Sequence, residues 1–331
     1  MHVMQGMMAS TLALQAQAQT QPAPPAPPQV QAAKLDLGLQ ARRLADDTWV
    51  IEGSNDSFGP ANGCNIINTA FIRTGAGVVV VNSGVSRRYG EQQRALIERT
   101  VREPVARVVQ LNHHPDYFLG NQAWADVPTQ ALPGSIADMQ ALGERYSDNL
   151  YRLCGDWLQG TVPTPSRESL TPGVQTLGDH RLEWLRLSGH TDDDLVLIDH
   201  TTGVAFVGGL VFADRVPTTP HANFANWLHS LDKLEALFHA GYFRWVVPSH
   251  GPVHQGLAGI AQTRDWIQWV TQHMRTQAEA GTDLSELLAT PAPARFAHWA
   301  ALPAELHRTF IRWYPEREAQ ALGSPTSPHK Q

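Results

Sequence analysis

A strand–helix–strand passage in the first half of the chain is the feature that most restricts its fold. Residues 77–81 and 105–111 are short apolar runs rich in valine, which predict two buried strands. Residues 87–102 between them carry apolar side chains at helical spacing, and Glu103-Pro104 ends that pattern. Parallel strands joined through a helix need a crossover connection within one sheet. The passage therefore predicts an α/β layer fold rather than an all-β one.

The rest of the chain continues this alternation of strand-like and helix-like runs. Gly, Pro and Asn separate the runs, and no internal repeat of roughly 20 to 50 residues is visible. The further predicted strands are 48–52, 65–73, 182–187, 195–199, 204–208 and 244–248, and the further predicted helices are 133–158, 224–239 and 256–278. We expect a leader over residues 1–33, one domain over 34–278, and a helical extension with a disordered tail over 279–331.

The first 33 residues have the composition of a leader rather than of a core. They contain no Asp, Glu, Lys or Arg, and five prolines lie between Pro22 and Pro28. An apolar run, Met7–Leu14, precedes Ala16-Gln17-Ala18, which has the form of a secretory cleavage site. We predict export to the periplasm. The alternative is a disordered leader rich in Pro, Ala and Gln, since the basic residues that open a signal peptide are missing.

Charge and cysteine content exclude several classes of protein. The 25 Lys and Arg residues against 31 Asp and Glu give a net charge of −6, without a basic cluster. Nucleic acids and anionic membranes need such a cluster to displace counterions, so neither is an expected partner. No run reaches the roughly 18 apolar residues of a membrane span. Cys64 and Cys154 are too few for a zinc ribbon and leave open either one disulfide or two buried thiols.

A group of potential metal ligands directly follows the second strand of the crossover. The strand over 105–111 leads into the sequence Asn-His-His-Pro-Asp-Tyr at residues 112–117, on a strand-to-helix loop of the kind that carries functional sites. In an extended segment alternate residues share one face. Asn112, His114 and Asp116 are therefore predicted to converge on one point, while His113 is directed away.

Two more histidines occupy comparable positions. His190 follows the strand over 182–187, and His250 follows the strand over 244–248. Histidines and a carboxylate at strand ends of one sheet are donors that suit Zn²⁺, so the sequence predicts a zinc site. The remaining histidines that we expect at the surface or in supporting positions are His113, His180, His200 and His254.

This order of motifs resembles the metallo-β-lactamase superfamily. Members carry an H-x-H-x-D-H loop, a later Gly-His, a strand-end Asp and a final Gly-His-Gly, and this chain has counterparts in the same order. The closer likeness is to the quinoprotein relay system zinc metallohydrolases, through residues 65–69, 86–90, 120–123 and 218–222. The resemblance implies a four-layer αβ/βα sandwich with a metal cleft along the strand ends, followed here by a C-terminal helical extension.

The likeness departs from the superfamily at the metal ligands. Asn112 and Tyr117 stand where the motif has its first and last histidines, and Gly209 stands where it has the strand-end Asp. Asn82 and Ser249 replace a usual Asp and Gly. The resemblance then leaves four metal ligands, His114, Asp116, His190 and His250. With the bridging carboxylate lost, two zinc ions would repel each other strongly, so we expect one zinc ion at most.

These residues leave two functions open. The first is an exported hydrolase in which one zinc ion activates water and Asp116 orients or deprotonates it, with a small molecule as substrate. The second is a catalytically inactive binding protein that serves a periplasmic quinoprotein system. In either case we place Asn112, Tyr117, His221 and Asn82 around the substrate, although His221 fits a solvated loop equally well.

Overall fold

The computed structural model describes residues 35–323 in two mixed β-sheets. The first sheet has the order β1-β2-β3-β4-β5-β6-β7, formed by Arg42–Ala45, Thr48–Ile51, Thr69–Arg73, Val78–Val81, Val105–Val109, Thr129–Ala131 and Glu168–Ser169. The second has the order β13-β12-β11-β10-β9-β8, formed by His254–Gln255, Trp245–His250, Val204–Phe212, Asp194–Asp199, His180–Leu187 and Gly173–Leu177. As predicted, β4 and β5 pair in parallel across a helix.

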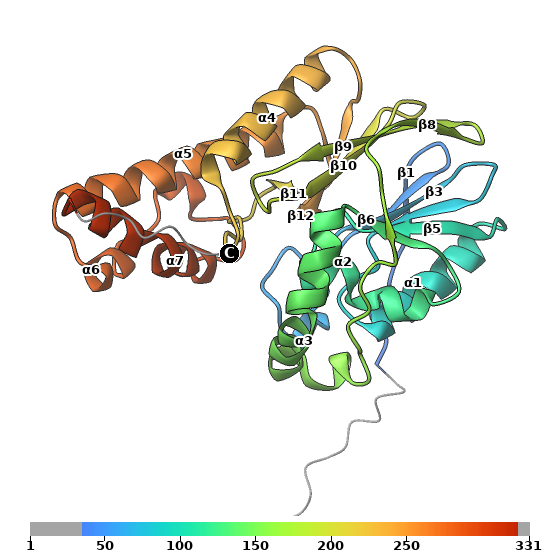
Figure 1. The fold of residues 1–331 in the computed structure, drawn as a ribbon, viewed down its shortest axis with the longest axis horizontal. Coiled ribbons are helices and arrows are strands. Elements are labelled where there is room, and N and C mark those ends of the chain that lie inside the picture. The colour runs from blue at the N-terminus through green and yellow to red at the C-terminus, as the bar shows by residue number, and fades with distance from the viewer. Residues whose placement is uncertain (1–34, 324–331) are drawn as a thin grey trace, which may run out of the picture.

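Helices cover the outer face of each sheet, which gives the four layers of an αβ/βα sandwich (Figure 1). The first sheet carries α1 (Arg87–Thr100) and α3 (Pro133–Cys154), and α2 (Pro115–Phe118) is a single turn after β5. The second sheet carries α4 (Phe224–His239) and α5 (Ala258–Glu279). The predicted fold class is confirmed.

The run of four valines in β4 shows why the sheets are buried on both sides. Val78 and Val80 pack in the core shared with α1 and α3, whereas Val79 and Val81 pack in the core between the two sheets. Alternate side chains of a strand point to opposite faces, so a strand covered on both faces reads as an uninterrupted apolar run. The three cores of the sandwich follow from this alternation.

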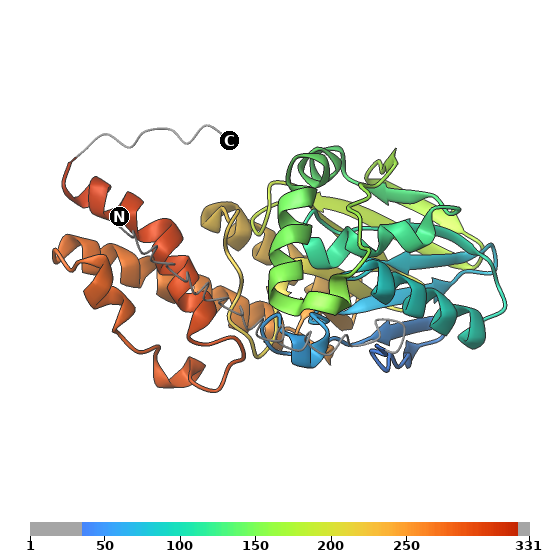
Figure 2. The same cartoon turned by 90° about the horizontal axis from the view of Figure 1, so that it is seen from below.

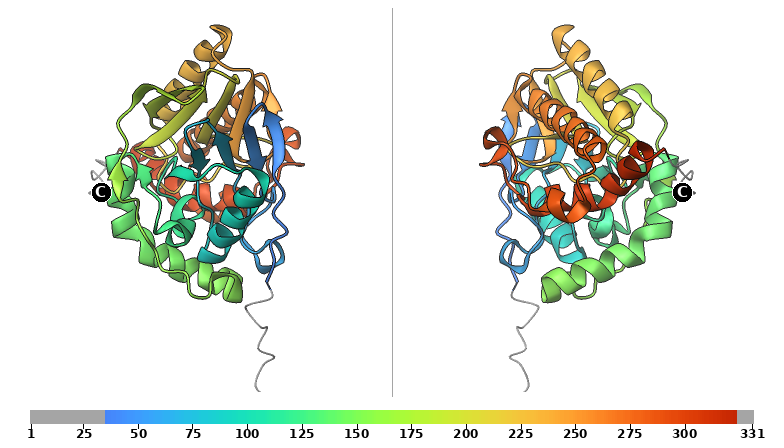
Figure 3. Two further views of the ribbon diagram at one scale, coloured as in Figure 1. Left: turned by 90° about the vertical axis from the view of Figure 1, so that its right-hand side faces the viewer. Right: turned by 90° about the vertical axis from the view of Figure 1, so that its left-hand side faces the viewer.

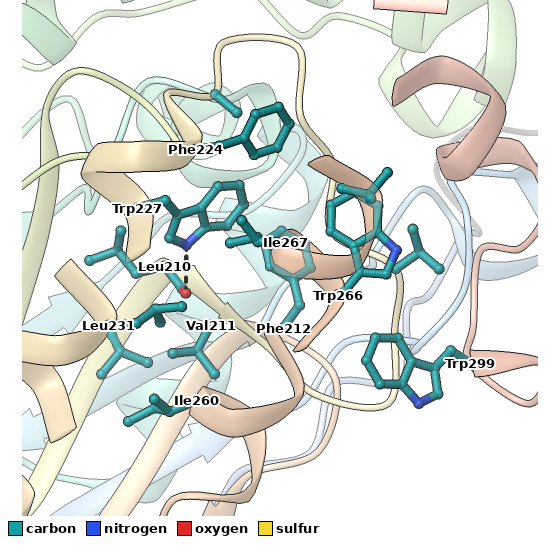
Figure 4. Packing of buried hydrophobic residues seen from close by; sticks show 14 of the residues in the cluster. Leu210, Val211, Phe212, Phe224, Trp227, Leu231, Ile260, Trp266, Ile267 and Trp299 are labelled. Carbon is teal, nitrogen blue, oxygen red and sulfur yellow. Dashed lines mark hydrogen bonds between the residues drawn. The ribbon is translucent and has the colours of Figure 1, made fainter. Parts of the chain in front are cut away.

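The outer core of the second sheet extends into the C-terminal helices. Trp227 of α4 donates its indole N–H to the Leu210 carbonyl at 2.9 Å and packs with Trp266 of α5 in the same core (Figure 4). Helices α6 (Leu284–Leu288) and α7 (Ala304–Ala321) add Phe310 and Tyr314 to that core. Figure 2 and Figure 3 show α6 and α7 beside α5. The predicted division at residue 278 stays a proposal.

One predicted strand is shorter than expected, and the reason matters for the site. The structure begins β3 at Thr69, not at Asn65. The amide nitrogen of Asn68 donates to the carbonyls of Pro248 and Gly251 at 2.9 and 2.8 Å, so the segment before β3 crosses to the second sheet. These hydrogen bonds hold the chain on both sides of His250.

A disulfide joins Cys64, before β3, to Cys154 at the end of α3. It resolves the choice that the sequence left open. Within residues 35–323 no helix is long and apolar enough to cross a membrane. The predicted leader over 1–33 and the end of the predicted tail lie outside the described residues.

Candidate metal centre

The strand directions bring the predicted site residues to one edge of the second sheet. β9 and β11 are each antiparallel to β10, and β12 is parallel to β11, so the carboxyl ends of β9, β11 and β12 share an edge. His190 follows β9, the loop with His221 follows β11, and His250 is the last residue of β12. The Leu195 N–H donates to the Leu111 carbonyl at 2.8 Å, which joins this edge to the end of β5 in the first sheet. Residues 112–117 therefore meet the three histidines.

Asn112 forms side-chain hydrogen bonds with two other residues of this region. It is fully buried, and its oxygen accepts the His114 backbone N–H at 2.9 Å. Its amide nitrogen consequently faces Nδ1 of His190, at 3.3 Å. An amide nitrogen only donates, so Nδ1 of neutral His190 accepts and the ring proton lies on Nε2. The Nε2 atom then has no free lone pair for a metal, and it is buried without a hydrogen-bond partner.

Asp116 and His250 form a different kind of pair. Nδ1 of His250 lies 2.9 Å from the Ile66 carbonyl and donates to it, which leaves a lone pair on Nε2. That Nε2 lies 3.3 Å from Oδ2 of Asp116, an oxygen with no hydrogen-bond partner. Two buried acceptors at this separation repel unless a proton or a cation lies between them. Burial also raises the pKa of the Asp116 carboxyl to about 7, which favours a shared proton.

Three imidazoles gather beside these pairs. Among residues 35–323, one group of three or more His, Cys, Asp or Glu side chains has ligand atoms all within 4.8 Å of one another, and it consists of His113, His114 and His221. We call it the histidine cluster. Nε2 of His114 lies 3.0 Å from Nδ1 of His221. The four predicted ligands, by contrast, do not form one such group.

The position of His113 corrects the expectation that it is directed away from the site. Its exposed fraction is 2%, and its ring centroid lies 5.0 Å from those of both His114 and His221. The extended geometry assumed for the loop fails because the chain bends over residues 111–114, before Pro115 begins the helical turn α2. The loop with His221 is likewise folded onto the site, so His221 borders it rather than standing in solvent.

The cluster is neutral at physiological pH. Burial, and after it the charges of neighbouring imidazoles, lower the pKa of His113 to about 3. Burial, and after it the charges of His190 and two arginines, lower the pKa of His221 to about 4. Burial and neighbouring imidazoles hold the pKa of His114 well below its ordinary value. Neutral imidazole is the form that binds metals, so the cluster is in a ligand state.

Tyr117 and Asn82 have supporting places. Burial, and then the charge of Asp116, raises the pKa of the Tyr117 phenol well above its ordinary value, so this residue is a hydrogen-bond donor and not a ligand. Its hydroxyl is buried without a hydrogen-bond partner. Asn82 accepts the Leu111 N–H at 3.0 Å, which fixes the chain just before the loop. Asn82 therefore positions the loop.

Comparison with known proteins identifies the family. The metallo-beta-lactamase superfamily model matches residues 62–250, which is more than half of the chain. The chain belongs to this superfamily. Among curated proteins none matches it.

Solved structures of metallo-beta-lactamases share the fold. One from Pontibacter korlensis is 21% identical, with a TM-score of 0.55, over 70% of this chain and 99% of that one. FIM-1 from Pseudomonas aeruginosa, in its mono-zinc form, is 17% identical, with a TM-score of 0.55, over 70% and 96%. The enzyme from Erythrobacter litoralis, with beta mercaptoethanol in its active site, is 22% identical, with a TM-score of 0.54, over 70% and 96%.

This superfamily member has donors that fit one metal ion. Three neutral imidazoles lie within 4.8 Å of one another, and the acceptors of Asp116 and His250 face each other at 3.3 Å. Gly209 adds no donor, and a Cβ atom there would lie 2.0 Å from Nδ1 of His190. A side chain at position 209 and the observed place of His190 are thus mutually exclusive.

Sequence reasoning missed one charged residue of this metallo-beta-lactamase-like site. Arg215 follows β11, is 1% exposed, and donates to the Asp56 carbonyl. Burial raises the pKa of the Asp116 carboxyl, and the positive charge of Arg215 opposes this rise. Burial lowers the pKa of the His250 imidazole, and the same charge lowers it as well. The only signal in the sequence was an arginine directly after a buried strand.

Proposed function

We propose that this protein is a hydrolase that uses one divalent ion, zinc, at the strand ends, and acts on a small molecule with an ester, lactone or thioester carbonyl. The observation that carries the proposal is the Asp116–His250 pair, whose two free acceptors lie 3.3 Å apart beside three neutral imidazoles. A base next to a metal position is the arrangement that water activation requires. The mono-zinc form of FIM-1 supports a single ion in this fold.

The chain's own residues then have separate roles. A divalent ion bound there supplies Lewis acidity that makes water nucleophilic near neutral pH. Asp116 accepts the proton of the attacking water, and Nε2 of His250 is in place to share it. Tyr117 donates a hydrogen bond toward the carbonyl oxygen on which charge develops. The proton finally goes to the leaving oxygen or sulfur.

The four ligands predicted from the sequence stay a prediction. The geometry divides them into Asp116 with His250, and His114 with His190, whose ring centroids lie 4.6 Å apart. An ion bound by all four would require His190 to release its hydrogen bond from Asn112. Membership of the superfamily therefore supports the proposed class of reaction more strongly than it supports the four predicted ligands.

A second candidate function is a binding protein without catalysis. Two features favour it. The hydrogen bond with Asn112 occupies Nδ1 of His190, and Gly209 has no side chain at the position where the superfamily has a metal-binding Asp. Such a protein would keep the fold and bind a small molecule beside Tyr117. The two candidates differ in whether the protein retains metal.

We also propose the finer assignments that depend on the sequence likeness. We propose membership of the quinoprotein relay branch, and with it a periplasmic quinoprotein partner, because two of the runs that resemble this branch lie at the site. Residues 65–69 include Asn68, which binds the chain next to His250. Residues 218–222 include His221. Export is supported by the disulfide, because such bonds persist in oxidising compartments. Sequencing the mature N-terminus tests export, and an intact Met1 would refute it.

The test of function measures metal and turnover together. Full-length protein is exposed to zinc, desalted and analysed by ICP mass spectrometry, then assayed against esters, lactones and thioesters. We expect about one zinc per chain and metal-dependent hydrolysis that Asp116→Asn reduces by about 100-fold or more. His239→Ala is the matched control, since that side chain is 65% exposed on α4. Zinc-free wild-type protein without hydrolysis would refute the hydrolase and favour the binding protein.

A further inference from the structure

We propose that His113, His114 and His221 are the ligands of a transition-metal site. This site is displaced from the four ligands that the family motif predicts and shares only His114 with them. The inference rests on the proposed function only in placing an ion at this end of the sheets. The chemical class of the ion is a borderline divalent metal such as Zn²⁺ or Co²⁺, because all three donors are imidazoles.

The spacing of the nitrogens suits such an ion. Zinc–nitrogen bonds of about 2.0–2.1 Å at tetrahedral angles hold two ligand nitrogens about 3.3 Å apart. Nε2 of His114 and Nδ1 of His221 are 3.0 Å apart, and the whole cluster lies within 4.8 Å. This contact is a hydrogen bond, so small side-chain rotations complete the site once its proton has moved to the other nitrogen of the same ring. Three protein ligands also leave a fourth position for water, as catalytic zinc sites do.

A carboxylate behind the cluster supports a ligand role for His113. Oδ2 of Asp138, on α3, lies 3.3 Å from Nδ1 of His113. Both ring nitrogens of His113 are buried without a hydrogen-bond partner, and the nearby carboxylate favours the tautomer that has the proton on Nδ1 and the lone pair on Nε2. That Nε2 atom is buried and has no hydrogen-bond partner, which is costly unless a ligand satisfies it.

Access to the site is through His221. It is the only one of the three that is not buried, and it lies in the loop between β11 and α4. This loop carries prolines at positions 217 and 220, which limit its conformations near the histidine. An ion can thus reach two buried imidazoles past one partly exposed one.

The same geometry explains why His190 and His250 are not ligands of this ion. His190 is tied to Asn112 through Nδ1. His250 faces Asp116, and both are left to handle protons. The division assigns metal binding to the loops after β5 and β11, and proton transfer to the pair at the end of β12.

Binding of the metal alone tests the site. Metal-stripped full-length protein is titrated with ZnCl₂ by calorimetry and with Co²⁺ by visible absorbance. We expect His113→Ala and His221→Ala to weaken zinc binding by more than about 100-fold, and Asp138→Asn by about 10- to 100-fold. The control His239→Ala should leave the affinity unchanged, and His190→Ala and His250→Ala should weaken it by less than 10-fold. His221→Gln, in the partly exposed loop, repeats the test if His113→Ala unfolds.

The outcomes separate this site from the proposed function. Metal retained by His113→Ala and His221→Ala but lost from His190→Ala and His250→Ala would overturn the site and leave a metal hydrolase intact. Metal bound by the cluster without hydrolysis would support the site and overturn the hydrolase. Wild-type protein that binds neither ion would overturn both.

Discussion

Replacing Gly209 by alanine would place one methyl group in the middle of the site. The new Cβ would lie 2.0 Å from Nδ1 of His190, whereas ordinary contact begins at 3.4 Å. His190 must therefore retreat by about 1.4 Å or β11 must bend. Retreat breaks the 3.3 Å hydrogen bond from Asn112 and leaves a buried amide donor unpaired.

The magnitude follows from these two effects. Forcing extra volume into a packed core costs about 1–3 kcal/mol, and an orphaned buried donor costs about 1–3 kcal/mol more. Replacing a strand glycine recovers about 0.5–1 kcal/mol of backbone entropy. We therefore expect Gly209→Ala to lower the free energy of unfolding by about 1–5 kcal/mol.

Urea unfolding followed by tryptophan fluorescence measures this loss. Gly59→Ala is the control, because its φ is −168° and no atom lies within 4 Å of a Cβ built there. The control should stay within about 0.5 kcal/mol of the wild type. The reasoning is refuted if Gly209→Ala is equally stable, since His190 would then not be held by Asn112 in the place observed.

Two further predictions concern stability away from the metal centre. Cys64 and Cys154 close a loop with a sequence separation of 90, so the double alanine variant should lose about 4 kcal/mol in urea unfolding; a loss under about 1 kcal/mol would contradict this. Burial by itself would lower the pKa of His180, but Asp199, 2.8 Å away, raises it above 6.5. The stability that this pair contributes is fully present below pH 6.5 and is lost as the pH rises through the raised pKa of His180. Asp199→Asn should therefore flatten the pH dependence of the free energy of unfolding above about pH 6.5. An unchanged slope would show that the His180–Asp199 pair does not cause this pH dependence.

Much of the fold was predictable because burial on both faces leaves a strong sequence pattern. The valines of 78–81 and the apolar run of 105–109 predicted parallel strands that the structure confirms. Among the strands that were not predicted, β8, over Gly173–Leu177, is an edge strand with mostly exposed side chains, so no apolar pattern marks it. The sequence predicted a strand over Asn65–Asn68, which the structure does not have. The hydrogen bonds that hold Asn68 join it to residues about 180 positions away, which local sequence does not reveal.

The site was predictable in composition but not in arrangement. Strand ends gave the right loops, since the directions of β9, β11 and β12 follow from the sheet. The alternation rule misplaced His113, because it assumes an extended chain over residues 111–114, where the chain bends. His221 joined the site through a loop conformation that local sequence does not determine.

Asn112 connects the arrangement of the histidines to a single hydrogen-bonding choice. The side-chain oxygen of Asn112 accepts the His114 N–H, so its amide nitrogen faces His190. Nδ1 of His190 must then accept, because the amide nitrogen can only donate. This removes one imidazole from metal binding and holds it where Gly209 leaves room. His114 forms its side-chain hydrogen bond with His221 instead, at 3.0 Å. The amide therefore favours the histidine cluster over the four-ligand site.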